Sequence, residues 1–308
     1  MGKYKNVGGQ AVIEGVMMRG SKKMATAIRK ENGEISVKSE EIVPLSKKNK
    51  LFSVPIIRGI VSFIDSLIIG INILNYSASF FEDEEEEGKF DKWFKETFKE
   101  KGTDILVGIS LILSLVFSFM LFFVMPTFVS GLLRNIVKNK FALNILEGLF
   151  RVLILVIYIF VVSKMGDIKR VFQYHGAEHK TIFCYEAEAE LTVENVKKFE
   201  RFHPRCGTNF LFLVMIISIL IFSVVGWESL WQRILYRLLL LPAVLGVSYE
   251  AIKWMGKSDG FLSRFFAYPG LLLQRITTEE PDEKQIEVAI KALKFAEGIE
   301  EVNDTEEK

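Results

Sequence analysis

The stretch Ile105–Val129, ILVGISLILSLVFSFMLFFVMPTFV, decides the class of fold, because it runs for 25 residues without a charged side chain. At 1.5 Å per helical residue, it is long enough to cross a bilayer hydrocarbon core about 30 Å thick. Thr208–Trp227 is a second uncharged stretch, of 20 residues. Half of the 308 residues are hydrophobic. These features favour a membrane protein over a soluble one.

Three further apolar stretches carry a few charges. Phe141–Ser163 contains Glu147 and Arg151, which are four residues apart and can pair on one helical face. Ile234–Ile252 has its charges near its ends. Leu51–Leu74 is the doubtful stretch, and could be re-entrant, interfacial or a buried span. The residues that interrupt it are Pro55, Arg58, Gly59, Asp65 and Gly70.

The distribution of Lys and Arg predicts the topology. If the other four stretches cross and the N-terminus is cytoplasmic, the inner segments hold 32 Lys and Arg residues and the outer loops hold 4. If Leu51–Leu74 also crosses, the best division is 21 against 15. Positive residues concentrate on the cytoplasmic side of membrane proteins. We therefore expect four crossings, with both termini in the cytoplasm.

The predicted fold is mainly α: a polytopic α-helical membrane protein with about four transmembrane helices, one re-entrant or interfacial apolar segment, and a small cytoplasmic β-hairpin. The hairpin is expected where Ala25–Lys30 and Glu34–Lys38 alternate around a turn. Pro281 should open an amphipathic helix, and the acidic run Glu82–Glu87 should be a solvated loop. The expected segments are 1–50 (Gly-rich motif and hairpin), 51–75 (membrane-associated helix), 76–103 (acidic linker), 104–252 (transmembrane helices with a cytoplasmic His/Cys loop at 164–209) and 253–308 (cytoplasmic C-terminal helical segment).

All three histidines and both cysteines of the chain fall within the 164–209 loop. His175, Glu178 and His179 form H-x-x-E-H, the inverted form of the zinc-protease helix motif. Positions i, i+3 and i+4 share one helical face, so two imidazoles can bind one metal with the Glu178 carboxylate beside them as a general base. The alternative without a metal is that the two histidines lie at a polar interface next to the membrane.

His203 and Cys206 offer further ligands, with the two-residue gap of a zinc knuckle. Three histidines with one open position would make a catalytic site, whereas Cys206 as a fourth ligand would make a structural one. Zinc is the expected metal, although imidazole also suits Fe, Ni and Cu. Cys184 should lie on the opposite face of the helix as a buried thiol.

The stretch Gly8–Gly20 contains four glycines and three functional polar side chains. The glycines would let the backbone approach another surface closely, or form a tight turn packed under the loop. The polar residues that could reach the metal shell or a substrate are Gln10, Glu14 and Arg19. The net charge of +1 gives no bias toward nucleic acid.

Four motifs, GGQAVIEGVMMRG, YHGAEHK, HPRCGTNF and ITTEEPDEKQIEVAIKAL, together resemble the YqhQ-like family of bacterial membrane proteins. That family is described as predicted metal-dependent enzymes and has no settled function. The resemblance implies a bacterial cytoplasmic-membrane protein, and it places His175, Glu178, His179, His203 and Cys206 in the proposed metal region. The inverted zinc-protease pattern would need a distant glutamate ligand, for which there are only scattered candidates: Glu186, Glu190 and Glu200.

Three functions follow as hypotheses. The first is a zinc-dependent hydrolase with its site at the cytoplasmic membrane interface, acting on an unknown substrate. The second is a non-enzymatic scaffold in which a closed metal site holds the loop and the cytoplasmic face binds a protein partner. The third and weakest is a transporter that uses Arg58 and Asp65. In each case the lipid bilayer is the surrounding partner.

Overall fold

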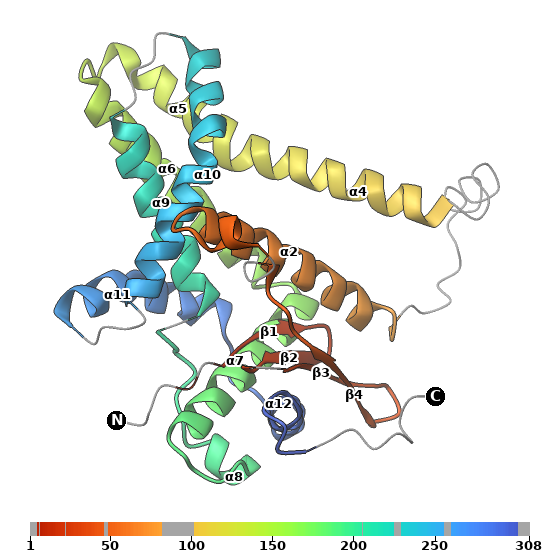
Figure 1. Cartoon of the computed structure of the whole chain (residues 1–308). Helices are drawn as coiled ribbons and strands as arrows, with labels where there is room; N and C mark the ends of the chain where they lie inside the picture. The colour runs from red at the N-terminus through yellow and green to blue at the C-terminus, as the bar shows by residue number, and fades with distance from the viewer. Residues whose placement is uncertain are drawn as a thin grey trace. The chain divides into compact units, whose positions relative to one another are not determined.

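A computed structural model describes residues 5, 7–21, 23–45, 49–81, 102–204, 206–224, 229–255 and 260–300 (Figure 1). The predicted acidic loop Glu82–Glu87 lies outside these residues. The chain forms two compact units, each assembled from segments that are distant in sequence. The first unit comprises Met1–Phe80, Tyr158–Ile217 and Leu241–Lys308, and the second comprises Phe81–Ile157 and Ser218–Leu240.

Among the described residues, four helical stretches are long and apolar enough to cross a membrane. Helix α2 spans Ile57–Ala78, α6 spans Lys140–Val162, and Trp231–Met255 lies within α10 (Leu230–Met255). The stretch Gly108–Asn135 runs through four consecutive elements: α4 (Gly102–Phe119), the π-helical turn η3 (Met120–Val124), α5 (Met125–Leu132) and η4 (Leu133–Asn135). The predicted class, a polytopic α-helical protein with membrane-length helices, is confirmed.

The doubtful segment 51–74 forms a continuous 22-residue helix from Ile57. Pro55 does not interrupt it, because Pro55 precedes the helix. Gly59 allows close packing, since a Cβ there would lie 2.7 Å from Tyr249 Cβ. The predicted span at 208–227 is shorter in the structure, where α9 covers the 17 residues Gly207–Ser223. The number of crossings and their direction stay predictions.

The N-terminal region folds into an antiparallel sheet, in which the described residues form four strands in the order β1-β2-β3-β4. The expected hairpin is confirmed as β3 (Lys23–Arg29) and β4 (Ile35–Glu41), with Gly33 at a φ of +87° in its turn. The Gly-rich motif is a second hairpin, made of β1 (Gly8–Val12) and β2 (Gly15–Arg19).

The sheet of the first unit has a hydrophobic core on each face. On one face, Val16 and Met18 pack with α7 (Gly166–Glu186) and α12 (Glu283–Ala296). On the other face, Met17 packs with Ile73 of α2. Helix α12 is the predicted amphipathic helix, and its buried positions recur at helical spacing. Asp282 caps it, in a capping box with Gln285. The buried members of its stripe are Ile286, Ala289, Ile290 and Leu293.

Candidate metal centre

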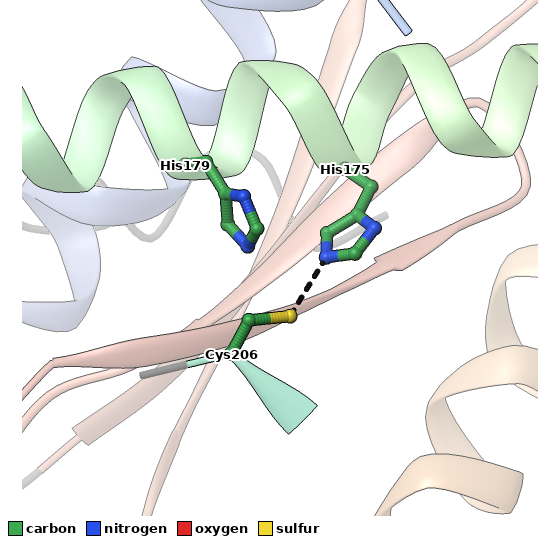
Figure 2. A group of neighbouring side chains, drawn as sticks. All are labelled: His175, His179 and Cys206. Carbon is green, nitrogen blue, oxygen red and sulfur yellow. Dashed lines mark hydrogen bonds between the residues drawn. The ribbon is translucent and has the colours of Figure 1, made fainter. Parts of the chain in front are cut away.

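The site is built from one face of α7 and the segment that leads into α9 (Figure 2). His175 and His179, one helical turn apart, both project toward Cys206. The ligand atoms of these three residues all lie within 4.8 Å of one another. His179 is buried, and the other two are partly buried. The structure therefore brings together three of the four predicted ligands in an arrangement that could hold a metal ion.

Backbone carbonyl groups fix the orientation of both imidazoles. His175 Nδ1 lies 2.8 Å from Thr277 O, and His179 Nδ1 lies 2.5 Å from Arg201 O. Because a carbonyl oxygen only accepts, each Nδ1 donates to it, and Nε2 is the atom of each ring that is left as a candidate metal ligand. His175 Nε2 is 3.2 Å from Cys206 Sγ, and His179 Nε2 is buried with no hydrogen-bond partner among the described residues. Metal-binding histidines in proteins are held in this way.

Cys206 offers the third ligand atom. Its sulfur and Thr208 Oγ1 share a hydrogen bond of 2.9 Å, and the Thr208 N–H donates to the sulfur at 3.5 Å. Burial by itself would raise the pKa of the thiol, but interactions with His179 and Thr208 outweigh it and lower the pKa below its usual value. The thiolate is the form that binds metals.

Glu178 lies beside the three candidate ligands, and only 5% of its surface is exposed. Burial raises the pKa of its carboxyl to about 8, His175 opposes that rise, and Cys206 adds to it. The N–H of Gly9 in β1 donates to the carboxylate. A Cβ at Gly9 would lie 2.9 Å from the carboxylate carbon and Oε1. Of the two interpretations of the Gly-rich motif, close approach of the backbone therefore applies at Gly9.

The segment between α11 (Phe261–Thr277) and α12 positions α7. The N–H of Glu279 donates to Phe172 O at 2.9 Å, and a Cβ at Gly176 would lie 2.1 Å from Glu279 O. Only glycine fits at this position of YHGAEHK. Lys180, buried at the end of the same motif, forms an ion pair with Glu280. These contacts place Thr277 O against His175.

His203 lies next to this group rather than within it. Its ring centroid is 5.5 Å from that of His179, and its Nε2 is 3.7 Å from Glu186 Oε2. Gln274 of α11 fixes its backbone through two hydrogen bonds of 2.7 Å each. Cys184 is buried as predicted, with its thiol directed at Glu190 O.

Two of the three polar residues of the Gly-rich motif bind partners outside the group of candidate ligands. Glu14 follows β1 and binds Arg170 through both carboxylate oxygens, and it accepts a bond of 3.2 Å from Tyr174. Gln10 donates to Gly70 O in α2 at 3.4 Å. Arg19, half-buried, ends β2 opposite Gly8.

Several residues that contact the candidate ligands were not predicted from the sequence. Thr208, which lies in the HPRCGTNF motif, touches the sulfur, and Gln274 clamps the loop of His203. The two orienting groups, Thr277 O and Arg201 O, are backbone atoms. Backbone carbonyls give no residue-specific signal, so only the fold could reveal them.

Comparison with known proteins places the chain in a family. The family described as "Protein of unknown function (DUF1385)" matches residues 54–298. The chain is 36% identical over 305 residues to "Uncharacterized protein YqhQ" of Bacillus subtilis (strain 168), covering 98% of this chain and 95% of that protein. No solved structure matches. The chain belongs to the DUF1385 family, as its motifs predict.

Proposed function

We propose that this protein is a membrane-bound, zinc-dependent hydrolase whose active centre is formed by His175, His179, Cys206 and Glu178. One observation carries the proposal. Both imidazoles donate a hydrogen bond from Nδ1 to a backbone carbonyl, and both present Nε2 toward the sulfur of Cys206 (Figure 2). Two imidazoles and a thiol with a lowered pKa match the nitrogen and sulfur ligands that zinc prefers.

The number of ligands favours a catalytic site over a structural one. Catalytic zinc sites use three protein ligands and keep one position open, whereas structural sites use four. The described residues supply three converging ligand atoms, and the fourth candidate, His203, faces Glu186. The scaffold hypothesis requires His203 to complete the site.

The chain's own residues define the chemistry. When bound, zinc would supply a water whose pKa is lowered to about 7 and would polarise a carbonyl or phosphoryl oxygen. Glu178 lies beside the ligands, and a bound cation would lower its carboxyl pKa from the value of about 8 that burial sets, so that the carboxylate could accept the proton. The Gly9 N–H holds this carboxylate in place, and its burial among β1 and α7 keeps bulk water away.

The transporter hypothesis receives less support. Arg58 forms a bidentate ion pair with Glu250 of α10, which accounts for its charge within the helix. Asp65 lies half-buried on α2. A one-to-one ion pair stabilises two packed helices without requiring a transport path.

The site is proposed to lie at the cytoplasmic interface of the bacterial membrane, with residues 1–50, 164–209 and 253–308 on the cytoplasmic side. The charge division of 32 against 4 supports this placement. Single-cysteine labelling at residue 190 in intact cells tests it. An impermeant reagent should not react there, and labelling would refute the topology.

Metal analysis of the purified full-length protein tests the metal site. We expect about one zinc per chain, and strong losses in His175→Ala and His179→Ala because each removes a ligand. His203→Ala should retain zinc if the site is open. Loss of zinc in His203→Ala would favour the closed, structural site, and undiminished zinc in the first two variants would refute the metal centre.

Glu178→Gln tests the hydrolase role. Glutamine keeps the shape of the side chain but cannot accept a proton, so the variant should retain zinc while activity falls about 100-fold or more. Complementation of a deletion strain measures the activity, and metal content controls for folding. A metal-loaded Glu178→Gln protein that complements fully would exclude Glu178 as the base.

A further inference from the structure

The second unit contains a buried group of charged side chains that the proposed function does not use. Glu147 and Arg151 lie one turn apart on α6, and Arg233 and Arg237 lie one turn apart on α10. Glu147 is 0% exposed, and none of the arginines is more than 8% exposed. These four residues are called the arginine cluster below.

The three guanidinium groups converge on one carboxylate. Arg237 contacts both oxygens of Glu147, with Nη2 at 2.7 Å from Oε2, and Arg233 forms an ion pair with Oε2. Arg151 Nη2 is more distant, at 3.3 Å from Oε1. The hydroxyl oxygens of Thr127 and Ser130 lie 2.8 and 3.2 Å from the same oxygens, and each hydroxyl is also within hydrogen-bond distance of a backbone carbonyl of the same helical stretch. A carboxylate has about four lone-pair positions, so Glu147 has no capacity left.

The cluster carries more positive than negative charge. Guanidinium groups stay protonated in proteins, so three positive charges surround one negative charge. Glu147 is the only acidic residue among the side chains that the structure describes in this unit, at 81, 108–157, 218–224, 229 and 231–240. If Arg233 is not counted, the excess of positive charge remains, because Arg151 and Arg237 both pair with the one carboxylate of Glu147.

Arg151 is the least balanced of the three cations. Its remaining donors go to neutral acceptors, Phe122 O at 3.0 Å and Ser218 Oγ at 3.4 Å. The faces of Phe123 and Phe222 lie 5.2 and 5.7 Å from its guanidinium carbon. Excess buried charge is costly among apolar helices, and in membrane proteins it marks a functional site by default. In the first unit, by contrast, Arg58 pairs with Glu250, so that one positive charge meets one negative charge.

We propose that the arginine cluster is a binding site for a phosphate-bearing anion. A guanidinium group can donate two parallel hydrogen bonds to two oxygens of one phosphate. A bound phosphate would also neutralise the positive charge that the single carboxylate of Glu147 does not balance. Glu147 and Arg237 each lie seven residues after the start of their helix, about 10 Å along its axis. The cations at the same end of α6 are exposed and would attract an anion: Arg134, Lys138 and Lys140.

A lipid headgroup and a free phosphate ion share this chemistry, so the experiment has two arms. In the first, the full-length protein in detergent is titrated with inorganic phosphate, with chloride at equal ionic strength as the control for screening. In the second, it is placed in nanodiscs of phosphatidylcholine alone or mixed with phosphatidylglycerol. The temperature of unfolding is measured in both arms, because a ligand that binds only the folded state raises it.

Arg151→Gln is the test variant, and Arg58→Gln is the matched control. A saturable rise with inorganic phosphate identifies a free oxyanion, and a rise only with phosphatidylglycerol identifies a lipid headgroup. In either case Arg151→Gln should weaken the response about tenfold or more, since it removes a charge-assisted hydrogen-bond donor, and Arg58→Gln should not weaken it.

The proposal fails if the native protein responds to neither probe, or if Arg151→Gln responds as the native protein does. The cluster would then be a purely structural ion network. If Arg151→Gln does not fold, Arg151→Lys replaces it, because lysine keeps the charge but lacks the planar fork. An unchanged response in Arg151→Lys would equally overturn the proposal.

Discussion

The candidate metal centre and the arginine cluster share a local arrangement but present opposite chemistry. Each starts from two residues four positions apart on one helical face, His175 and His179 in α7, Glu147 and Arg151 in α6. In the candidate metal centre, backbone carbonyls accept hydrogen bonds from both imidazoles, and the atoms that converge are possible metal ligands. In the arginine cluster, the converging atoms are N–H donors. The atoms that remain after internal pairing decide whether a site attracts a cation or an anion.

The two sites should also differ in how they respond to mutation. The metal centre depends on geometry, because main-chain atoms that no substitution can remove orient its ligands. The arginine cluster depends on charge, because its members are held mainly by one another. The comparison between the two sites is therefore tested by substitutions that change either the orientation of the ligands or the charge of a side chain, but not both.

The largest effect is expected for Glu147→Gln. This variant removes the only described acid among three buried guanidinium groups, and breaking a buried ion pair costs about 3–5 kcal/mol of unfolding free energy. Glu250→Gln is the control, since Glu250 and Arg58 are each 27% exposed, and loss of a partly exposed pair should lower the unfolding free energy much less. Denaturant unfolding in detergent measures both. Equal losses in the two variants would mean that the cluster is no more charge-dependent than an ordinary pair.

Cys206→Ser should have the next largest effect, on metal affinity. Serine keeps the size of the side chain but replaces the soft sulfur ligand, so affinity for zinc should fall about 100-fold or more. Cys184→Ser is the matched control, because Cys184 is buried on another face of α7 with its thiol near Glu190 O. Competition with a chelator measures both affinities. A comparable loss in Cys184→Ser would indicate that the effect arises from general unfolding.

Gly176→Ala tests the geometry of the metal centre without changing a ligand. The added Cβ would lie 2.1 Å from Glu279 O, so the segment before α12 must shift, and with it the carbonyl that orients His175. Loss of such an orienting partner lowers metal affinity about 10-fold to 100-fold. Gly33→Asn is the control, because Gly33 has φ of +87° with open space around it, and asparagine tolerates that conformation. Native affinity in Gly176→Ala would show that α7 and this segment can adjust.

Much of this architecture could be predicted from the sequence. The apolar stretches and the alternation around Gly33 predicted helices and the β3-β4 hairpin, because hydrophobic periodicity is a local property. The clustering of His175, His179 and Cys206 in one loop predicted their approach. The position of His203 could not be predicted, because it depends on Gln274, 71 residues away. The convergence of Arg233 and Arg237 on Glu147 likewise requires the packing of two helices distant in sequence.

The smallest effect is expected for Glu14→Gln, in a residue that the sequence offered as a candidate for the metal shell. In the structure its carboxylate binds Arg170, whose side chain is 52% exposed, and solvent weakens such a pair. The pair also raises the pKa of the Arg170 guanidinium, mainly through the hydrogen bonds to Glu14. Glutamine keeps an acceptor for Tyr174, so the unfolding free energy should fall by about 1 kcal/mol or less.

Zinc content should be unchanged in Glu14→Gln, because the structure pairs Glu14 with Arg170 and Tyr174 and not with the three ligands. Measuring zinc and stability on the same preparation separates the two roles. A fall in zinc at native stability would place Glu14 in the metal shell after all, which would require the β1-β2 turn to move toward the ligands. The β1-β2 turn would then join Gly9 of β1 in the metal centre, and the orientation of the three ligands by backbone carbonyls would not by itself account for the zinc affinity.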